Sequence, residues 1–283
     1  MAIALCLIVG AAPVHADSIG MVAGDIACAP EMPTTPTTCR DEQTSDLLIA
    51  HKPDFVLTVG DNQYETGKLS DFREAYDKTW GRFRDITRPT PGNHEYRRED
   101  ARGYFNYFGA KAHPGRRGYY SFEVEGWHLI ALNSNISTRK TSRQVEWLRR
   151  DLTSNPSECT LAYWHHPLYS SGEHGNNPKV RPLWKALNAA DAELVINGHN
   201  HNYERFAPQN AYGKKRSGGI REIVVGTGGR NLRPFRNIEP HSRVRNRRTF
   251  GVVKLRLGLD DYGWEFVPET GGTFTDSGQD DCG

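Results

Sequence analysis

The chain of 283 residues has no Cys-x-x-Cys pair and no apolar run long enough to span a bilayer as a mature helix. The missing Cys-x-x-Cys spacing argues against a zinc knuckle. Net charge is almost absent as well, because 36 basic residues oppose 34 acidic ones, so the global charge indicates no partner. No internal repeat, long linker or low-complexity segment divides the chain. The sequence therefore predicts one domain over residues 17–283.

The first 16 residues differ from the rest of the chain. An apolar run at 2–12 is followed by small residues at 13–16, placed as in a signal-peptidase site. No Lys or Arg precedes the run, so the basic leader typical of an export signal is missing. We predict a signal peptide over 1–16 and a secreted or periplasmic protein. The alternative is a misassigned start.

Four cysteines follow this leader: Cys28, Cys39, Cys159 and Cys282. An even number without zinc-site spacing favours disulfides in an oxidising compartment. Cys28 with Cys39 would close a loop rich in Pro and Thr, and Cys159 with Cys282 would tie down the C-terminus. The sequence leaves the pairing open, and four free thiols are the alternative.

Strands and helices alternate along the chain. Thr44 or Ser45 is expected to cap a helix that Lys52-Pro53 ends, and helical spacing predicts further helices near 72–80, 142–152 and 179–190. This rhythm predicts an α/β fold with parallel strands, in which ligands gather at the carboxyl ends of strands. Aliphatic or alternating runs predict strands at 18–23, 55–59, 119–124, 127–133, 160–164, 193–197, 222–225, 251–257 and 262–267.

Side chains that can bind metals recur at five strand exits. Taken singly, each has an ordinary structural explanation as a turn, capping or core residue, but five exits in one chain favour a metal site. Two cations about 3.5–4 Å apart need a shared carboxylate between them. Carboxylate, imidazole and phenolate donors together favour transition metals over calcium. The candidates are Asp25, Asp61, Tyr64, Asn93, His94, His165, His166, His174, His199 and His201.

The order of these motifs closely resembles that of the calcineurin-like metallophosphoesterases. The motifs are Gly24-Asp25, Gly60-Asp61-Asn62-Gln63-Tyr64, Gly92-Asn93-His94-Glu95, Ala162-Tyr163-Trp164-His165 and Gly198-His199-Asn200-His201. The Tyr three residues after the second Asp narrows the resemblance to the purple acid phosphatases and their small bacterial relatives. The resemblance spans about residues 19–206, and it implies a metallophosphoesterase-like sandwich of two mixed β-sheets flanked by helices. One departure is Ile26-Ala27-Cys28, where the family commonly has a Gly.

By matched position, the resemblance implies a role for each candidate. Asp25, Tyr64 and His201 would bind a first metal, usually Fe(3+). Asp61 would bridge to a second metal, Fe(2+), Zn(2+) or Mn(2+), held by Asn93, His165 and His199. His165 is chosen over His166 because the family's ligand is followed by one residue and then Pro. Asn93, His94 and His174 match substrate-binding positions, and His94 and His174 would also be catalytic, binding phosphate or protonating the leaving oxygen.

The implied function is acid phosphatase activity, in which a metal-bound hydroxide hydrolyses small anionic phosphate monoesters. A phosphodiesterase or nucleotide-directed hydrolase on the same centre is the nearest alternative, and a secreted, non-catalytic metal- or phosphate-binding protein is another. The stretch from Lys214 to Arg248 contains eleven basic residues and only two acidic ones, Glu222 and Glu239. This stretch would attract an anionic substrate or form a solvated loop. No nucleic-acid-reading motif accompanies it, and the oligomeric state is not indicated.

Overall fold

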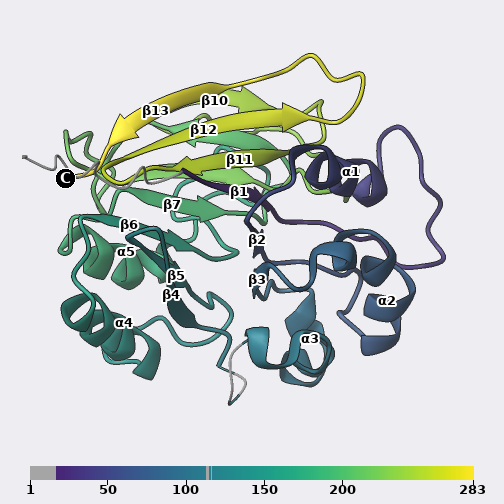
Figure 1. Ribbon diagram of the computed structural model, residues 1–283, viewed down its shortest axis with the longest axis horizontal. Helices are drawn as coiled ribbons and strands as arrows, with labels where there is room; N and C mark the ends of the chain where they lie inside the picture. Colours follow the sequence, from purple (N-terminus) through teal and green to yellow (C-terminus); the bar gives the residue numbers. More distant parts are fainter. Residues whose placement is uncertain (1–16, 113–114, 116) are drawn as a thin grey trace, which may run out of the picture.

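The computed structural model describes residues 17–112, 115 and 117–283, and Figure 1 shows two β-sheets with helices around them. The expected signal peptide, 1–16, lies outside the described residues. The first sheet has the order β13-β12-β11-β1-β2-β3. Its strands are β1 (Ser18–Ala23), β2 (Phe55–Val59), β3 (Thr87–Thr90), β11 (Gly251–Leu257), β12 (Asp261–Pro268) and β13 (Ser277–Asp281).

The second sheet has seven strands in the order β10-β8-β9-β7-β6-β5-β4. Both sheets are mixed, since β1, β2 and β3 run parallel while β11 is antiparallel to β1, and β5, β6, β7 and β9 run parallel between antiparallel neighbours. The expected sandwich is confirmed. The strands are β4 (Tyr120–Val124), β5 (Trp127–Ala131), β6 (Cys159–Tyr163), β7 (Leu194–Asn197), β8 (Tyr203–Phe206), β9 (Arg221–Val225) and β10 (Ser242–Asn246).

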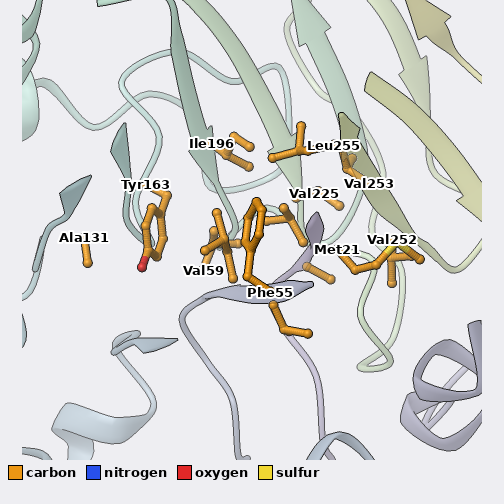
Figure 2. Close-up of a cluster of buried hydrophobic side chains, with 14 of the residues drawn as sticks. Met21, Phe55, Val59, Ala131, Tyr163, Ile196, Val225, Val252, Val253 and Leu255 are labelled. Carbon is orange, nitrogen blue, oxygen red and sulfur yellow. The ribbon is translucent and has the colours of Figure 1, made fainter. Parts of the chain in front are cut away.

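The main hydrophobic core lies between the sheets, as the labelled side chains of Figure 2 show. Strand β6 illustrates why the central strands are apolar on both faces. Its Leu161 and Tyr163 belong to this core, whereas Ala162 packs in a second cluster with Leu148 and Leu183 of the helices. Helices over the outer face thus bury alternate residues of the same strand.

The helices lie outside the sheets. In Figure 1, α4 (Arg143–Ser154) and α5 (Arg181–Asn188) lie beside β4, β5 and β6, and α3 (Arg102–Phe108) lies near β3. The other helices are α1 (Asp41–His51) and α2 (Leu69–Glu74), and the short 3-10 segments are η1 (Tyr76–Lys78), η2 (Trp80–Phe83), η3 (Glu95–Arg97), η4 (Glu99–Ala101), η5 (Gly109–Ala112) and η6 (Pro178–Val180). In the described part of the chain, no helix is both long and apolar enough to cross a bilayer.

Two helix predictions need correction. Helix α1 begins at Asp41, so Thr44 and Ser45 are buried inside it rather than capping it. Thr44 Oγ1 instead donates a hydrogen bond to the carbonyl of Gly228. The expected helix at 72–80 breaks into α2 and two 3-10 segments. The backbone N–H of Tyr76 donates to Gln63 Oε1 at 3.1 Å, which draws it away from helical pairing.

Both cysteine pairings considered from the sequence are present. Cys28 and Cys39 close the loop before α1, with their Cα atoms 5.4 Å apart. Cys159 and Cys282 join the start of β6 to the residue after β13, with their Cα atoms 5.3 Å apart. The second bridge crosses between the two sheets and anchors the last strand of the chain.

Candidate metal centre

The ends of four parallel strands bring the predicted donors together. Asp25, Asp61, His165 and His199 each lie two residues beyond the end of β1, β2, β6 and β7. Asp25, Asp61 and His199 have positive φ values of 58°, 48° and 68°, so the backbone turns sharply at each strand exit. Such conformations are uncommon for residues other than Gly and cluster at functional sites.

Gly60 and Gly92 are required for this convergence. Gly60 has φ of +86°, and a Cβ there would lie 2.6 Å from His165 Nδ1. A Cβ on Gly92 would lie 2.1 Å from Asp61 Oδ1. Because real Cβ atoms do not approach so closely, any side chain at either position would displace a candidate ligand.

One half of the site surrounds the Tyr64 hydroxyl. Its oxygen lies 2.9 Å from Asp25 Oδ1, 3.0 Å from Asp61 Oδ2 and 3.0 Å from His201 Nε2. A phenol has one proton and cannot donate it to three partners at once. These four atoms are arranged as they would be around a cation. The side chains of Asp25, Tyr64 and His201 are buried.

The other half surrounds His165. Its Nε2 atom lies 3.3 Å from Asp61 Oδ2, 3.0 Å from Asn93 Oδ1 and 3.2 Å from His199 Nδ1. Asn93 and His199 are partly exposed, so this half opens toward solvent. Asp61 Oδ2 therefore contacts both halves, as a bridging carboxylate would.

Neighbouring groups fix the orientation of the imidazole rings. The Nδ1 atom of His165 lies 2.9 Å from the carbonyl of Val59, and that of His201 lies 2.7 Å from the carbonyl of Asn231. A carbonyl at one ring nitrogen sets the tautomer and leaves the other nitrogen's lone pair for a metal. Both Nε2 atoms therefore face the site, where they are available to bind a metal.

Electrostatics show that the site attracts positive charge. Burial tends to raise the pKa of Asp61, but the neighbouring His165 and His94 outweigh it and hold this pKa well below its usual range. Burial alone would lower the pKa of His165, but the Asp61 carboxylate outweighs burial and raises this pKa to about 9. A metal cation entering this half would displace that proton. Burial and the charge of His165 hold the pKa of His199 well below its usual value, which keeps its ring neutral.

The donor set fits a pair of transition metals. Ligand atoms of Asp25, Asp61 and His165 lie within 4.8 Å of one another, as do those of His165, His166 and His199. Mixed oxygen and imidazole donors with one phenol suit iron, zinc or manganese better than calcium.

Comparison with known proteins agrees with this arrangement. The family model described as calcineurin-like phosphoesterase matches residues 22–203. The chain belongs to the calcineurin-like phosphoesterase family. The matched region contains all seven predicted metal ligands.

Within this family, the curated relatives include purple acid phosphatases of Arabidopsis thaliana. The chain is 30% identical to purple acid phosphatase 15 over 68% of its own length and 43% of the relative's. It is also 30% identical to purple acid phosphatase 21, over 82% and 57% respectively. The chain thus spans about half the length of these relatives.

The fold is that of a purple acid phosphatase isolated from yellow lupin (Lupinus luteus) seeds. The TM-score is 0.77 at 20% identity, and the match covers 93% of this chain and 53% of the lupin chain. At this identity the likeness establishes the sandwich architecture.

His94 and His174 lie beside different members of the donor set. The His94 ring packs 4.2 Å from the Tyr64 ring, its Nδ1 lies 2.7 Å from the carbonyl of Glu65, and its Nε2 lies 3.9 Å from Asp61 Oδ2. The exposed His174 ring stacks on His199 at 4.5 Å. Both predicted outer histidines therefore border the same centre.

His166 borders the open half without sharing the contacts of His165. Its Nδ1 lies 2.7 Å from Ser134 Oγ, and its ring lies 4.4 Å from the His199 ring. His165, by contrast, is the ring that reaches both Asp61 and Asn93.

Two residues near the centre received no role from the sequence. Glu95, fully buried, accepts hydrogen bonds from the backbone N–H groups of Gly92, Asp61 and Gln63 at 2.7–3.1 Å. Burial, together with the Asp61 charge, raises its pKa to about 7. Arg230 lies 5.2 Å above the Tyr64 ring. The Gly-Asn-His-Glu motif could have signalled Glu95, whereas Arg230 is recognised only through the tertiary contact.

Proposed function

We propose that this protein is a dimetal phosphatase that hydrolyses phosphate monoesters. The observation that carries the proposal is the position of Asp61 Oδ2, which lies 3.0 Å from the Tyr64 hydroxyl and 3.3 Å from His165 Nε2. One carboxylate oxygen between two donor clusters is the arrangement that a pair of adjacent cations requires. The curated relatives named purple acid phosphatases support the same activity.

In this proposal each half of the site holds one metal. Asp25, Tyr64 and His201 bind Fe(3+), Asp61 bridges, and Asn93, His165 and His199 bind Fe(2+), Zn(2+) or Mn(2+). When bound, the two ions supply an activated water and neutralise charge on the phosphoryl group. The open half, which contains the partly exposed Asn93 and His199, is the side on which substrate enters.

The outer histidines act on the phosphoester itself. Because Nδ1 of His94 donates to the Glu65 carbonyl, its Nε2 is turned to the site, and in the protonated ring this nitrogen donates a hydrogen bond to a phosphoryl oxygen. His174 stands over His199 at the solvent-facing rim, where a leaving alkoxide would depart. There it donates the proton that the leaving oxygen needs, and general acid catalysis of this kind contributes about 10²–10⁴-fold.

The two disulfides favour an oxidising compartment, so the proposal includes a secreted or periplasmic location. The substrate is then a small anionic phosphoester outside the cytoplasm. Residues 17–283 would act as a single catalytic domain.

The deciding experiment combines metal analysis with hydrolysis of two substrates. Protein purified without chelator should contain about two metal ions per chain and hydrolyse 4-nitrophenyl phosphate faster than bis(4-nitrophenyl) phosphate. Preference for the bis-ester would favour a phosphodiesterase instead. Two bound metals with hydrolysis of neither substrate would indicate a non-catalytic binding protein.

The assignment of Tyr64 has its own optical test. A ferric phenolate absorbs visible light, so iron-loaded protein should be coloured and the Tyr64→Phe variant should lose the band. An unchanged spectrum in Tyr64→Phe would show that Tyr64 is not the phenolate ligand.

A further inference from the structure

The position of the His174 ring depends on the loop that carries it. His174 is exposed and lies in a short loop, Ser171–Gly175, that contains two glycines. Among the described residues, its ring makes no hydrogen bond, and its contacts are the stacked His199 ring and the His201 ring at 6.4 Å. The place of this ring over the centre therefore depends on how the loop is held.

Asn200 holds the loop from inside. Its Oδ1 accepts a hydrogen bond from the backbone N–H of His174 at 2.9 Å, and the Asn200 side chain is almost fully buried. A Cβ on Gly172 would lie 2.4 Å from the same oxygen, so the loop backbone rests directly on Asn200. The residue between the two ligating histidines of Gly198-His199-Asn200-His201 thus supports one end of the loop.

The segment Arg230–Arg236 holds the loop from outside. The backbone N–H of Arg236 donates to the carbonyl of Ser171 at 2.9 Å, and Gly172 forms a bridge with Phe235. The same segment is tied to the metal centre, because the N–H of Arg233 donates to the carbonyl of His201 at 2.8 Å. Part of the basic stretch noted in the sequence is therefore a fixed support beside the centre.

Glu173 fastens the loop to this support. Its carboxylate lies 3.2 Å from Arg233 Nη1 and 2.8 Å from Arg236 Nη2, so one carboxylate joins two guanidinium groups. The side chains are 27%, 36% and 63% exposed for Glu173, Arg233 and Arg236. Ion pairs this exposed add little to stability.

We propose that Glu173 is a positioning residue for His174, which it acts on by clamping the 171–175 loop between Arg233 and Arg236. The proposal rests on the proposed function of His174 as the group that protonates the leaving oxygen. Removing the carboxylate would let the loop move while leaving the metal ligands in place. Since a misplacement of about 1 Å can cost roughly 10²-fold in rate, even a small movement would be measurable.

The test compares two phosphate monoesters that differ in their need for a proton. 4-Nitrophenolate leaves without protonation, whereas an alkoxide leaving from glycerol phosphate requires it. Glu173→Gln and Glu173→Ala should lower kcat for glycerol phosphate about tenfold more than kcat for 4-nitrophenyl phosphate, with KM nearly unchanged. Melting temperature and metal content should stay at the wild-type values.

Asp191→Asn is the matched control, because it removes one carboxylate from an exposed ion pair with Arg216, at 3.8 Å, outside the site. It should leave both kcat values unchanged. If Glu173 acts through the arginines, Glu173→Ala and Arg236→Ala should be non-additive, so the double variant should be no slower than the slower single variant.

Several results would overturn the proposal. Equal losses on both esters, a change confined to KM, additive variants or wild-type kinetics would each show that Glu173 does not position the proton donor. These outcomes leave the proposed phosphatase function intact, since wild-type protein and Asp191→Asn would still hydrolyse both esters. If wild-type protein with two metals hydrolyses neither ester, the proposed function fails and this proposal fails with it.

Discussion

Two regions of this protein that bury carboxyl groups place opposite surroundings around them. Asp25 and Asp61, at the ends of β1 and β2, face imidazole nitrogens and the Tyr64 hydroxyl. Glu222, on β9, accepts hydrogen bonds from the backbone N–H groups of Leu168 and Tyr169 at 2.9 and 3.2 Å. Both regions remove the carboxyl group from water, but only the first surrounds it with groups that can bind a metal.

The pKa directions follow from these neighbours. Burial raises the pKa of Glu222 well above its usual value, and its two N–H donors do not offset this. Burial acts on Asp61 in the same sense, but His165 and His94 reverse the outcome. Burial alone therefore does not identify a functional carboxylate. The groups around the two carboxyls distinguish them, because His165 and His94 favour the ionised form of Asp61, whereas the N–H donors at Glu222 do not offset burial.

The largest effect should come from changing Asp61, whose Oδ2 atom contacts both halves of the candidate metal site. Asp61→Asn keeps the shape of the side chain and removes the charge that both halves use. We expect a loss of about 10³-fold or more in phosphatase kcat, because the charge stabilisation supplied by bound metal is worth several kcal/mol. Metal analysis after dialysis should find fewer than two tightly bound ions. Full retention of both would show that Asp61 does not bridge.

Metal removal should lower the thermal stability of the protein through the Asp25 and Asp61 region. At a free metal concentration of about 1,000 times Kd, binding to the native state adds about 4 kcal/mol. Removal by a chelator should therefore lower Tm by roughly 10 °C, at about 2–4 °C per kcal/mol for a domain of this size. Differential scanning calorimetry of wild-type protein and Asp61→Asn provides the measurement. Asp61→Asn should have the Tm of chelated wild-type protein whether or not metal is added. An equal rise in Tm on adding metal to the wild type and to the variant would contradict the bridging role of Asp61.

The sequence predicted the first region well because its signal is local. An aliphatic run that ends in Gly-Asp or Gly-His places a ligand at a strand end whatever the rest of the fold does. Asp25, Asp61 and His199 follow such runs, and the other four predicted ligands lie close to these three in the structure. The sequence could also predict the strand that carries Glu222, but not its burial, because a charged residue at a strand start is ordinarily exposed. Its partners, the N–H groups of Leu168 and Tyr169, lie more than 50 residues earlier in the chain.

Three of the four edge strands in the described part of the chain were missed for a related reason. Strand β13, Ser277–Asp281, contains no large apolar residue and forms by pairing with β12 beside the Cys159–Cys282 bridge. Strand β10, Ser242–Asn246, alternates with exposed arginines and pairs only with β8. Strand β3 contains Pro89, which usually argues against a strand but is accepted at the edge of the first sheet. Hydrophobic pattern cannot reveal strands that are stabilised by a neighbour's hydrogen bonds.

The smallest predicted effect concerns Glu222 and the pH dependence of stability. With the folded-state pKa raised, folded and unfolded states are both protonated below about pH 4.5, the usual value for Glu. Above that pH the unfolded state loses its proton first, so the native state binds more protons and its stability falls as pH rises. Glu222→Gln has no charge to lose, so its stability should not fall in this way. Relative to wild type, it should gain roughly 2–4 °C in Tm between pH 4.5 and neutral pH, the change that about 1 kcal/mol produces.

Glu265→Gln, which changes a half-exposed partner of Lys254, is the control and should show no such gain. A Glu222→Gln variant whose loss of stability relative to wild type grows as the pH rises from 4.5 to neutral would mean that the ionised carboxylate is the form that the two N–H groups select. Glu222 would then belong with Asp61 in being kept charged, and the distinction between the two regions would rest on metal binding alone.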